Sequence, residues 1–231
     1  MQHILGTIPH LLMAILITIP FIKNKKGTLI KIIMTFALSC AVVLTPDILK
    51  FFGLLAGHSL FFFPVIVGLY SICYQIAIGQ MESKSVMVMF SFILIIGHIM
   101  LDFFGNGAHL FYPFSEEDLN FSIIDKFDLT LIVYLLILTT VVIKFNLNRQ
   151  ILFVGLLLLV IFSGLSAVSK LQLEKQLSKE YNDEEVELLI TYPENAVTWN
   201  YQVRTPNRII VGTADKFRNT IEIDVVTEFQ E

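Results

Sequence analysis

The chain has few cysteines and no excess of positive charge, and these two absences exclude several classes of protein. Its two cysteines, Cys40 and Cys73, lie in apolar runs and form no Cys-x-x-Cys pair, so they indicate neither a zinc ribbon nor a disulfide framework. The net charge of −4, with no basic stretch interleaved with aromatic residues, argues against a nucleic-acid partner. No Ser-His-Asp elbow, glycine-rich phosphate loop or nucleotide fingerprint is present either.

Apolar residues are what the chain has in abundance. They make up 55% of it, with 20 phenylalanines, and the mean hydropathy is +0.72. A soluble domain of this size does not need so much apolar surface, so the sequence predicts a mainly α, multi-pass membrane protein with a bundle of about six transmembrane helices. The predicted spans are Ile4–Ile22, Leu29–Leu44, Leu60–Gly79, Val86–Phe104, Leu129–Lys144 and Ile151–Val168. The first has no charged flank or small-residue cleavage site before it, which predicts a retained helix.

Charge divides the chain near Lys170. Residues 1–169 carry 9 Lys/Arg and 8 Asp/Glu, whereas the last 62 residues carry 7 and 12. We therefore expect a transmembrane domain over 1–169 and a soluble unit over 170–231. The soluble unit begins with a polar helical run and continues with LLITYP, VTWNYQVR, RIIVGTA and TIEIDVVTEF, which alternate as strands do and are separated by turn residues. This pattern predicts a small antiparallel β unit of four strands in a meander.

The basic residues between the spans predict the orientation. Six of them fall in the first, third and fifth connections: Lys23, Lys25, Lys26, Lys84, Lys144 and Arg149. The second and fourth connections hold only Lys50 and Lys126. Because short cytoplasmic loops are enriched in lysine and arginine, both termini are expected on the extracytoplasmic side.

This orientation gathers the histidines on one side of the membrane. All five are placed at or beyond the outer ends of the spans: His3, His10, His58, His98 and His109. His98 and Asp102 are four residues apart near the end of VMVMFSFILIIGHIMLDFF, and therefore share a helical face. A carboxylate within hydrocarbon costs roughly 2.5–3.5 kcal/mol, so Asp102 is expected to have a partner or a function.

Imidazole and carboxylate groups in this arrangement are suited to a divalent metal. The candidate ligands are Asp47, His58, His98, Asp102 and His109, with His10 and His3 as further candidates, and zinc is the expected metal, with iron or manganese as alternatives. Such an ion lowers the pKa of a bound water and polarises a phosphoryl or acyl oxygen. A structural alternative stays open for each residue: a boundary histidine with a hydrogen bond, Asp47 ending a helix after Pro46, or His98 as no more than the proton partner of Asp102.

Two further residues are candidates for acid or base catalysis. His109 lies in the long outer connection of residues 105–128, and Asp125 lies near its end. Asp125 and Asp128 are alternatively placed to cap the fifth span, where the helix dipole favours negative charge. A site at headgroup depth would act on a lipid or lipid-linked phosphoester.

Several segments resemble the YdjM-like family of bacterial inner-membrane metal-dependent hydrolases. They are TPDILKFF, AGHSLFFFP, GHIMLDFFGNGAHLFYPFS with SIIDKFDL after it, and YPENAVTWNYQVR. The resemblance implies a location in the cytoplasmic membrane and a hydrolase activity. The chain departs from the family pattern at Leu49, where a second aspartate is usual, at Gly53-Leu54, which replaces a His-Arg pair, and at Gly57, which replaces a threonine.

A more distant similarity is to the zinc-dependent phospholipases C and P1-type nucleases. Their ligands follow the order Asp, His, His-x-x-x-Asp, His, which Asp47, His58, His98, Asp102 and His109 reproduce. No histidine follows His109, so the later His-x-x-x-Glu of that family is missing and a three-metal centre is not expected.

Two other functional classes remain open. One is a non-enzymatic membrane scaffold whose β unit binds a partner, which the departures at Leu49 and Gly53 favour. The other is a proton-coupled carrier with Asp102 and His98 as a relay. Against a carrier, the polar groups cluster at one end of the spans and no paired broken helices are visible.

Overall fold

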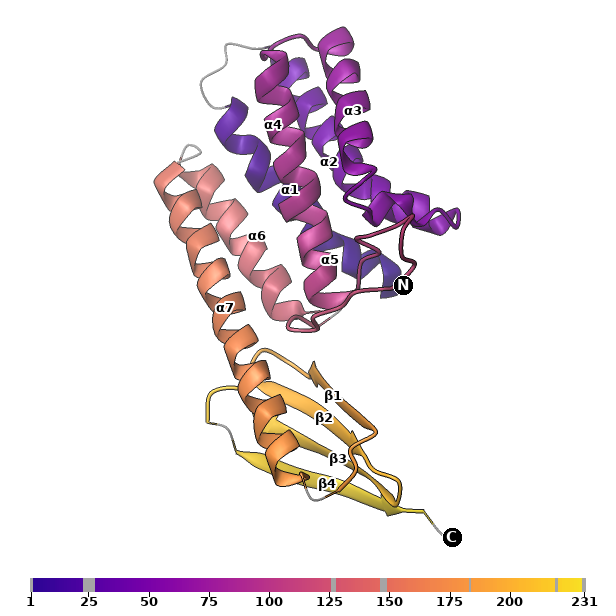
Figure 1. The fold of residues 1–231 in the computed structure, drawn as a ribbon. Helices are drawn as coiled ribbons and strands as arrows, with labels where there is room; N and C mark the ends of the chain where they lie inside the picture. Colours follow the sequence, from indigo (N-terminus) through magenta and orange to yellow (C-terminus); the bar gives the residue numbers. More distant parts are fainter. Residues whose placement is uncertain are drawn as a thin grey trace. The chain divides into compact units, whose positions relative to one another are not determined.

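The structure is a computed structural model that describes residues 2–22, 28–125, 128–145, 149–182, 184–218 and 220–229. In the first helix, side chains are described from Gly6 onward. The chain divides into two compact units (Figure 1). The first comprises Met1–Phe121 with Leu129–Gly155, and the second comprises Ser122–Asp128 with Leu156–Glu231.

The first unit is helical. Its elements are α1 (Gln2–Ile22), α2 (Leu29–Phe51), the 3₁₀ turn η1 (Leu55–His58), α3 (Phe63–Ala77), α4 (Ser83–Leu94), the π-helical turn η2 (Ile95–Ile99), α5 (Met100–Gly105) and α6 (Leu129–Lys144). Fully buried apolar side chains from α1, α2 and α4, among them Leu16, Val43 and Phe90, form its core. A hydroxyl contact joins α1 to α2, because Thr18 donates a hydrogen bond to Ser39 Oγ at 2.8 Å.

Three helices of the described residues, and not the six predicted, are long and apolar enough to cross a membrane. They are Leu29–Phe51, Ser83–Gly105 and Arg149–Glu180. The other apolar helices are shorter: Gly6–Ile22, Phe63–Ala77 and Leu129–Lys144. At 1.5 Å per residue, the 15 residues of α3 reach about 23 Å, less than the hydrocarbon thickness of about 30 Å. Hydropathy could not reveal this, because apolar residues 60–62 precede α3 in a turn rather than belonging to it.

Two helices extend beyond their predicted spans. Helix α2 continues through Pro46 to Phe51, so Asp47 lies inside the helix rather than after it. Helix α7 (Arg149–Glu180) runs without a break through Lys170, where the charge changes. A proline removes one backbone hydrogen bond but does not have to end a helix whose other groups are satisfied.

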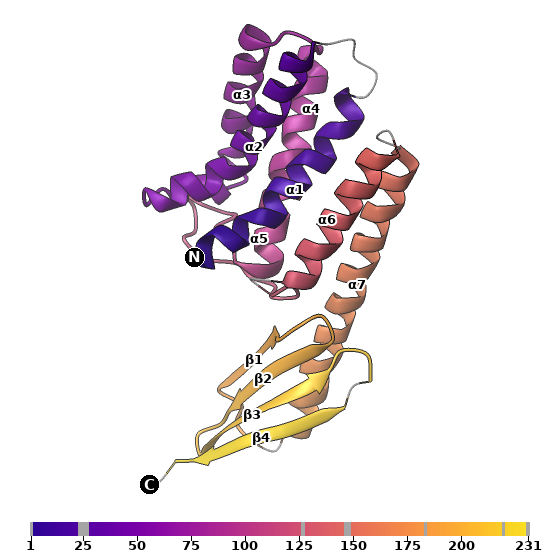
Figure 2. The ribbon, with the colours of Figure 1, turned by 180° about the vertical axis from the view of Figure 1, so that it is seen from behind.

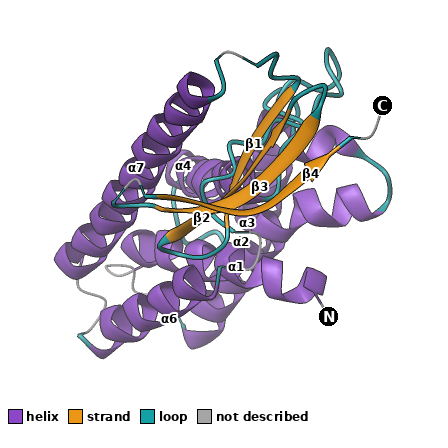
Figure 3. Ribbon diagram, turned by 90° about the horizontal axis from the view of Figure 1, so that it is seen from below, coloured by secondary structure: helices purple, strands orange, loops and turns teal. Residues whose placement is uncertain are grey.

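The second unit contains an antiparallel sheet with the order β1-β2-β3-β4, so the predicted four-stranded meander is confirmed. The strands are β1 (Leu188–Pro193), β2 (Thr198–Arg204), β3 (Arg208–Asp215) and β4 (Ile221–Glu228) (Figure 3). Alternate residues of β2 and β3 are buried, and these include Trp199, Tyr201, Val203, Ile210 and Ala214. The alternate residues that give the sequence its period of two are therefore those on the buried face of the sheet.

Polar contacts attach the C-terminal half of α7 to this sheet. Ser169 donates a hydrogen bond to the Lys216 carbonyl at 2.5 Å and accepts one from Trp199 Nε1 at 3.0 Å. The Lys170 ammonium donates to the Thr191 carbonyl at 2.8 Å. The helix thus covers one face of the strands (Figure 2).

Candidate metal centre

A continuous helical segment made of α4, η2 and α5 presents His98 and Asp102. The π-helical turn Ile95–Ile99 includes His98, and Asp102 follows in α5. Single π turns inside α-helices are frequent at functional sites. The carbonyl of Gly97, within this turn, accepts a hydrogen bond from His10 Nδ1 at 2.9 Å. The turn therefore positions one candidate ligand and orients a second histidine on α1.

Four of the predicted ligands converge. His58 Nε2 lies 2.9 Å from Asp102 Oδ2, and His98 Nε2 lies 3.1 Å from the same oxygen. The two Nε2 atoms are 3.2 Å apart. Asp47 Oδ1 lies 3.9 Å from His58 Nε2 and 3.8 Å from His98 Nε2. The four ligand atoms all lie within 4.8 Å of one another.

Packing of α2 against η1 brings Asp47 and His58 together. Gly57 lies against Pro46 so closely that an added Cβ would be 2.7 Å from Pro46 Cα and 3.2 Å from Leu49 Cβ. This contact needs a residue without a side chain, and it holds His58, the next residue, beside the turn of α2 that carries Asp47. The backbone packing of this chain therefore requires glycine at position 57.

The donor set fits a tetrahedral divalent ion. Ligand atoms about 2.0–2.1 Å from a tetrahedral zinc ion are about 3.3 Å apart, and the five separations given above, from 2.9 to 3.9 Å, surround that value. Among the described residues, Nδ1 of both His58 and His98 is buried without a hydrogen-bond partner, so both rings make their polar contacts through Nε2. Two carboxylates and two neutral imidazoles carry a charge of −2, which a divalent cation balances.

Asp102 is the most connected member of the cluster. Its second oxygen, Oδ1, accepts a hydrogen bond from Asn106 Nδ2 at 2.9 Å and lies 3.3 Å from His10 Nε2. His10 thus contacts the Asp102 carboxylate rather than joining the four converging atoms. It does so through Oδ1, the oxygen that does not face His58 and His98. Asp102, His58 and His98 are buried, whereas the Asp47 side chain is 33% exposed. The cluster is therefore accessible at Asp47.

Two other predicted residues are not part of the four-residue cluster. His109 is half-buried, and its Nδ1 lies 3.0 Å from the Glu116 carbonyl in the loop after α5. Asp125 belongs to the second compact unit, whereas the cluster belongs to the first. The side chain of His3 lies outside the described residues.

Sequence reasoning missed Asn106. It follows Asp102 by four residues, which is the spacing of neighbours on one helical face. Its side-chain amide can therefore donate a hydrogen bond to the carboxylate of a candidate ligand. That spacing is visible in LDFFGN.

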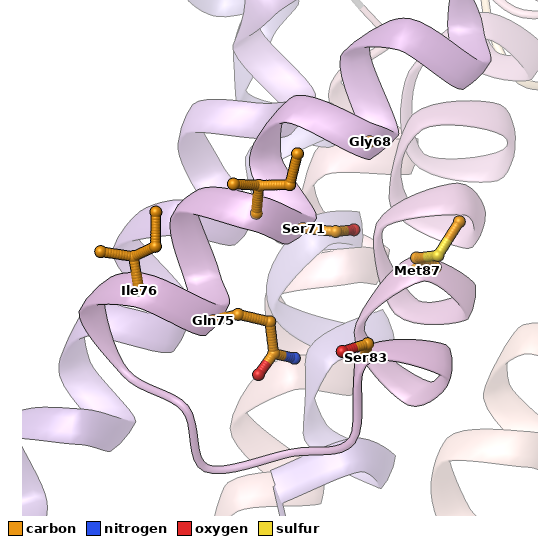
Figure 4. Close-up of a pocket in the computed structure, with 7 residues that line it drawn as sticks. Gly68, Ser71, Gln75, Ile76, Ser83 and Met87 are labelled. Atoms are coloured by element: carbon orange, nitrogen blue, oxygen red, sulfur yellow. The ribbon is translucent and has the colours of Figure 1, made fainter.

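A separate cavity of about 360 Å³ lies between α3 and α4. It is lined by Gly68, Ser71, Ile72, Gln75, Ile76, Ser83 and Met87 (Figure 4). The cavity shares no residue with the metal-ligand cluster. Its lining contains no His, Cys, Asp or Glu side chain.

Comparisons of the chain with family models, with curated proteins and with solved structures found no match.

Proposed function

We propose that this chain is an integral membrane hydrolase that uses a divalent metal ion, held by Asp47, His58, His98 and Asp102, to cleave a phosphoester. The observation that supports it most is the convergence of two imidazole nitrogens and two carboxylate oxygens in a chain that also has three apolar helices of membrane-spanning length. Zinc is the first metal to test, because the set contains equal numbers of nitrogen and oxygen donors at near-tetrahedral separations.

The chemistry of the proposal is hydrolysis. A bound divalent ion supplies Lewis acidity, which makes water more acidic and stabilises negative charge on phosphoryl oxygens. Cleavage adds the oxygen of water to phosphorus and breaks the bond to the alcohol, which leaves with a proton. His109 is a candidate to transfer that proton: donation from its Nδ1 to the Glu116 carbonyl leaves a lone pair on Nε2. Asp125 stays a second candidate.

The membrane and the orientation belong to the same proposal. We place the protein in the cytoplasmic membrane, with the three shorter apolar helices also embedded and with the site on the extracytoplasmic side. The excess of lysine and arginine in the odd-numbered connections and the resemblance to the YdjM-like hydrolases support this placement.

Metal content tests the proposal. Detergent-purified protein should contain about one zinc, iron or manganese ion per chain by elemental mass spectrometry, and His98→Ala and Asp102→Ala should lose it. Asp47→Asn is the variant least disposed to misfold, since Asp47 is partly exposed, and it should also lose most of the metal. His109→Ala serves as the matched control and should keep the metal.

The absence of metal from the wild-type protein, in a folded preparation supplemented with each ion, would contradict the proposal. It would favour the non-enzymatic scaffold instead. Retention of the metal in both His98→Ala and Asp102→Ala would show that the ion binds elsewhere.

A further inference from the structure

Exposed phenylalanines follow the metal-ligand residues in the chain. We call them the aromatic rim: Phe51, Phe52, Phe61, Phe62, Phe111 and Phe114. Phe51 is 85% exposed and Phe114 is 79% exposed. The first pair ends α2 beyond Asp47, the second follows His58, and the third lies in the loop after Asp102. The rim therefore belongs to the same ends of the helices as the candidate metal centre.

Direct contacts hold two segments of the rim together. The rings of Phe61 and Phe114 meet edge to face with centroids 4.8 Å apart. The Leu60 N–H donates to the Leu110 carbonyl at 3.1 Å, and the Ser59 hydroxyl donates to the Tyr112 carbonyl. Because Ser59 directly follows His58, these contacts place this part of the rim next to a metal ligand. In both Figure 1 and Figure 2, the C-terminal end of α2 and α5 lie at the same end of the helical unit.

A cation stands beside the accessible edge of the cluster. Lys50 and Phe51 follow Asp47 at i+3 and i+4, so the three share a face of α2. Asp47 is the partly exposed ligand, and Lys50 is exposed. The open side of the centre therefore has a carboxylate ligand, a lysine ammonium and an apolar ring in sequence along one helical face.

This combination matches an amphiphile with an anionic head. The ends of a membrane-spanning helix lie near the headgroup region, and α2 is one of the helices of membrane-spanning length. A lysine ammonium binds phosphate as a point charge. Apolar rings that stand exposed on three neighbouring segments are suited to contact acyl chains rather than water.

We propose that the aromatic rim and Lys50 form the substrate-binding surface of the site, and that the substrate is a membrane lipid with a phosphate in its headgroup. The phosphate lies between Lys50 and the metal, and the acyl chains lie along the rim. The part of this inference that calls the lipid a substrate rests on the proposed hydrolase function. The lipid-binding surface itself can be tested without activity and without metal.

The test is lipid binding by native mass spectrometry, with dioleoyl phosphatidate and dioleoylglycerol as probes that differ in the phosphate. The protein in nonionic detergent should bind phosphatidate at least about tenfold more tightly than dioleoylglycerol, equivalent to about 1.4 kcal/mol. Phe61→Ser/Phe114→Ser should weaken the binding of both lipids about tenfold. Lys50→Gln should weaken only phosphatidate, and so reduce the preference.

Matched controls come from exposed residues away from the rim. Phe145→Ser/Phe153→Ser removes two exposed phenylalanines, and Lys84→Gln removes an exposed lysine at the start of α4. Neither should change the binding of either lipid.

The possible outcomes separate this inference from the proposed function. Equal binding by the rim variant and its control would overturn the inference, whatever the metal content. Equal binding of the two lipids by the wild-type protein would also overturn it, because the surface would then be a general membrane contact. Selective phosphatidate binding in a protein that contains no metal would support the lipid surface and contradict only the hydrolase.

Discussion

Asp102 shows at the scale of one residue why the cluster needs its neighbours. Its two oxygens contact three histidines and Asn106, although the side chain is almost fully buried within a helix of membrane-spanning length. A buried carboxylate without partners is far more costly than one with several hydrogen bonds. Asn106 and His10 fix the carboxylate through Oδ1, which leaves Oδ2 directed at the two other imidazoles.

Removal of Asn106 should weaken metal binding without removing a ligand. In Asn106→Ala the Asp102 carboxylate loses its 2.9 Å hydrogen bond, and partners of this kind contribute about 10–100-fold to metal affinity. Competition with a chromophoric chelator measures the change in dissociation constant. Asn200→Ala in β2 is the control and should leave the affinity unaltered. If Asn106→Ala binds metal as tightly as the wild type, the hydrogen bond from Asn106 to Asp102 Oδ1 does not contribute to metal affinity.

Gly57 and Gly68 form a matched pair of substitutions. Gly57→Ala places a Cβ 2.7 Å from Pro46 Cα and should cost about 1–3 kcal/mol of unfolding free energy by overpacking. It should also displace His58 and reduce metal affinity. Gly68→Ala meets nothing within 4 Å and, in the interior of α3, should stabilise by up to about 1 kcal/mol. Thermal unfolding with and without added zinc measures both effects, and equal behaviour of the two variants would contradict the packing argument.

At the scale of elements, the strands could be predicted from sequence and the helix details could not. Alternation in LLITYP and TIEIDVVTEF places β1 and β4 within one residue of their observed bounds, although nearly all residues of β4 are exposed. The π turn at Ile95–Ile99 and the passage of α2 through Pro46 are set by tertiary packing, which local pattern does not encode. The proximity of His98 and Asp102 could be predicted, because residues four apart lie on nearly the same face in both an α-helix and a π turn.

The attachment of α7 to the sheet depends on Ser169. In Ser169→Ala, the buried Trp199 Nε1–H and the Lys216 carbonyl both lose a partner, which should cost about 1–3 kcal/mol. Fluorescence of Trp199, the one tryptophan in the sequence, follows unfolding of this unit during heating. Ser178→Ala, at an exposed position of the same helix, should unfold as the wild type does. If both variants unfold alike, Ser169 contributes little to the attachment.

At the scale of the whole molecule, the helices carry many exposed apolar side chains. Large apolar residues stand exposed along α2, α3 and α7, with Leu29, Ile76 and Phe153 each more than half exposed. Such surfaces are stable against lipid hydrocarbon and unfavourable against water. The second unit buries Trp199, Tyr201 and Lys216, so its stability should respond to pH in water.

Lys216 provides that pH dependence. Its ammonium lies 4.2 Å from the centroid of the Trp199 ring, and burial lowers its pKa to about 8, although the carboxylates of Asp128 and Asp125 act in the opposite direction. The unfolded chain has the ordinary lysine pKa of about 10.4, so between about pH 8 and 10.4 it binds a proton that the folded unit does not. Stability should therefore rise with pH across this window and be insensitive to this group below it.

Heating the protein at pH 7.5, 9 and 10 while recording Trp199 fluorescence tests the expectation. The unfolding temperature of the wild type relative to that of Lys216→Met should increase with pH. Lys175→Met, at an exposed position on α7, should keep the wild-type dependence. Tyr201 does not interfere, because burial raises its pKa to about 12, above the window. Parallel pH profiles for wild type and Lys216→Met would mean that the ammonium is hydrated in the folded unit, and that the Trp199 contact does not desolvate it.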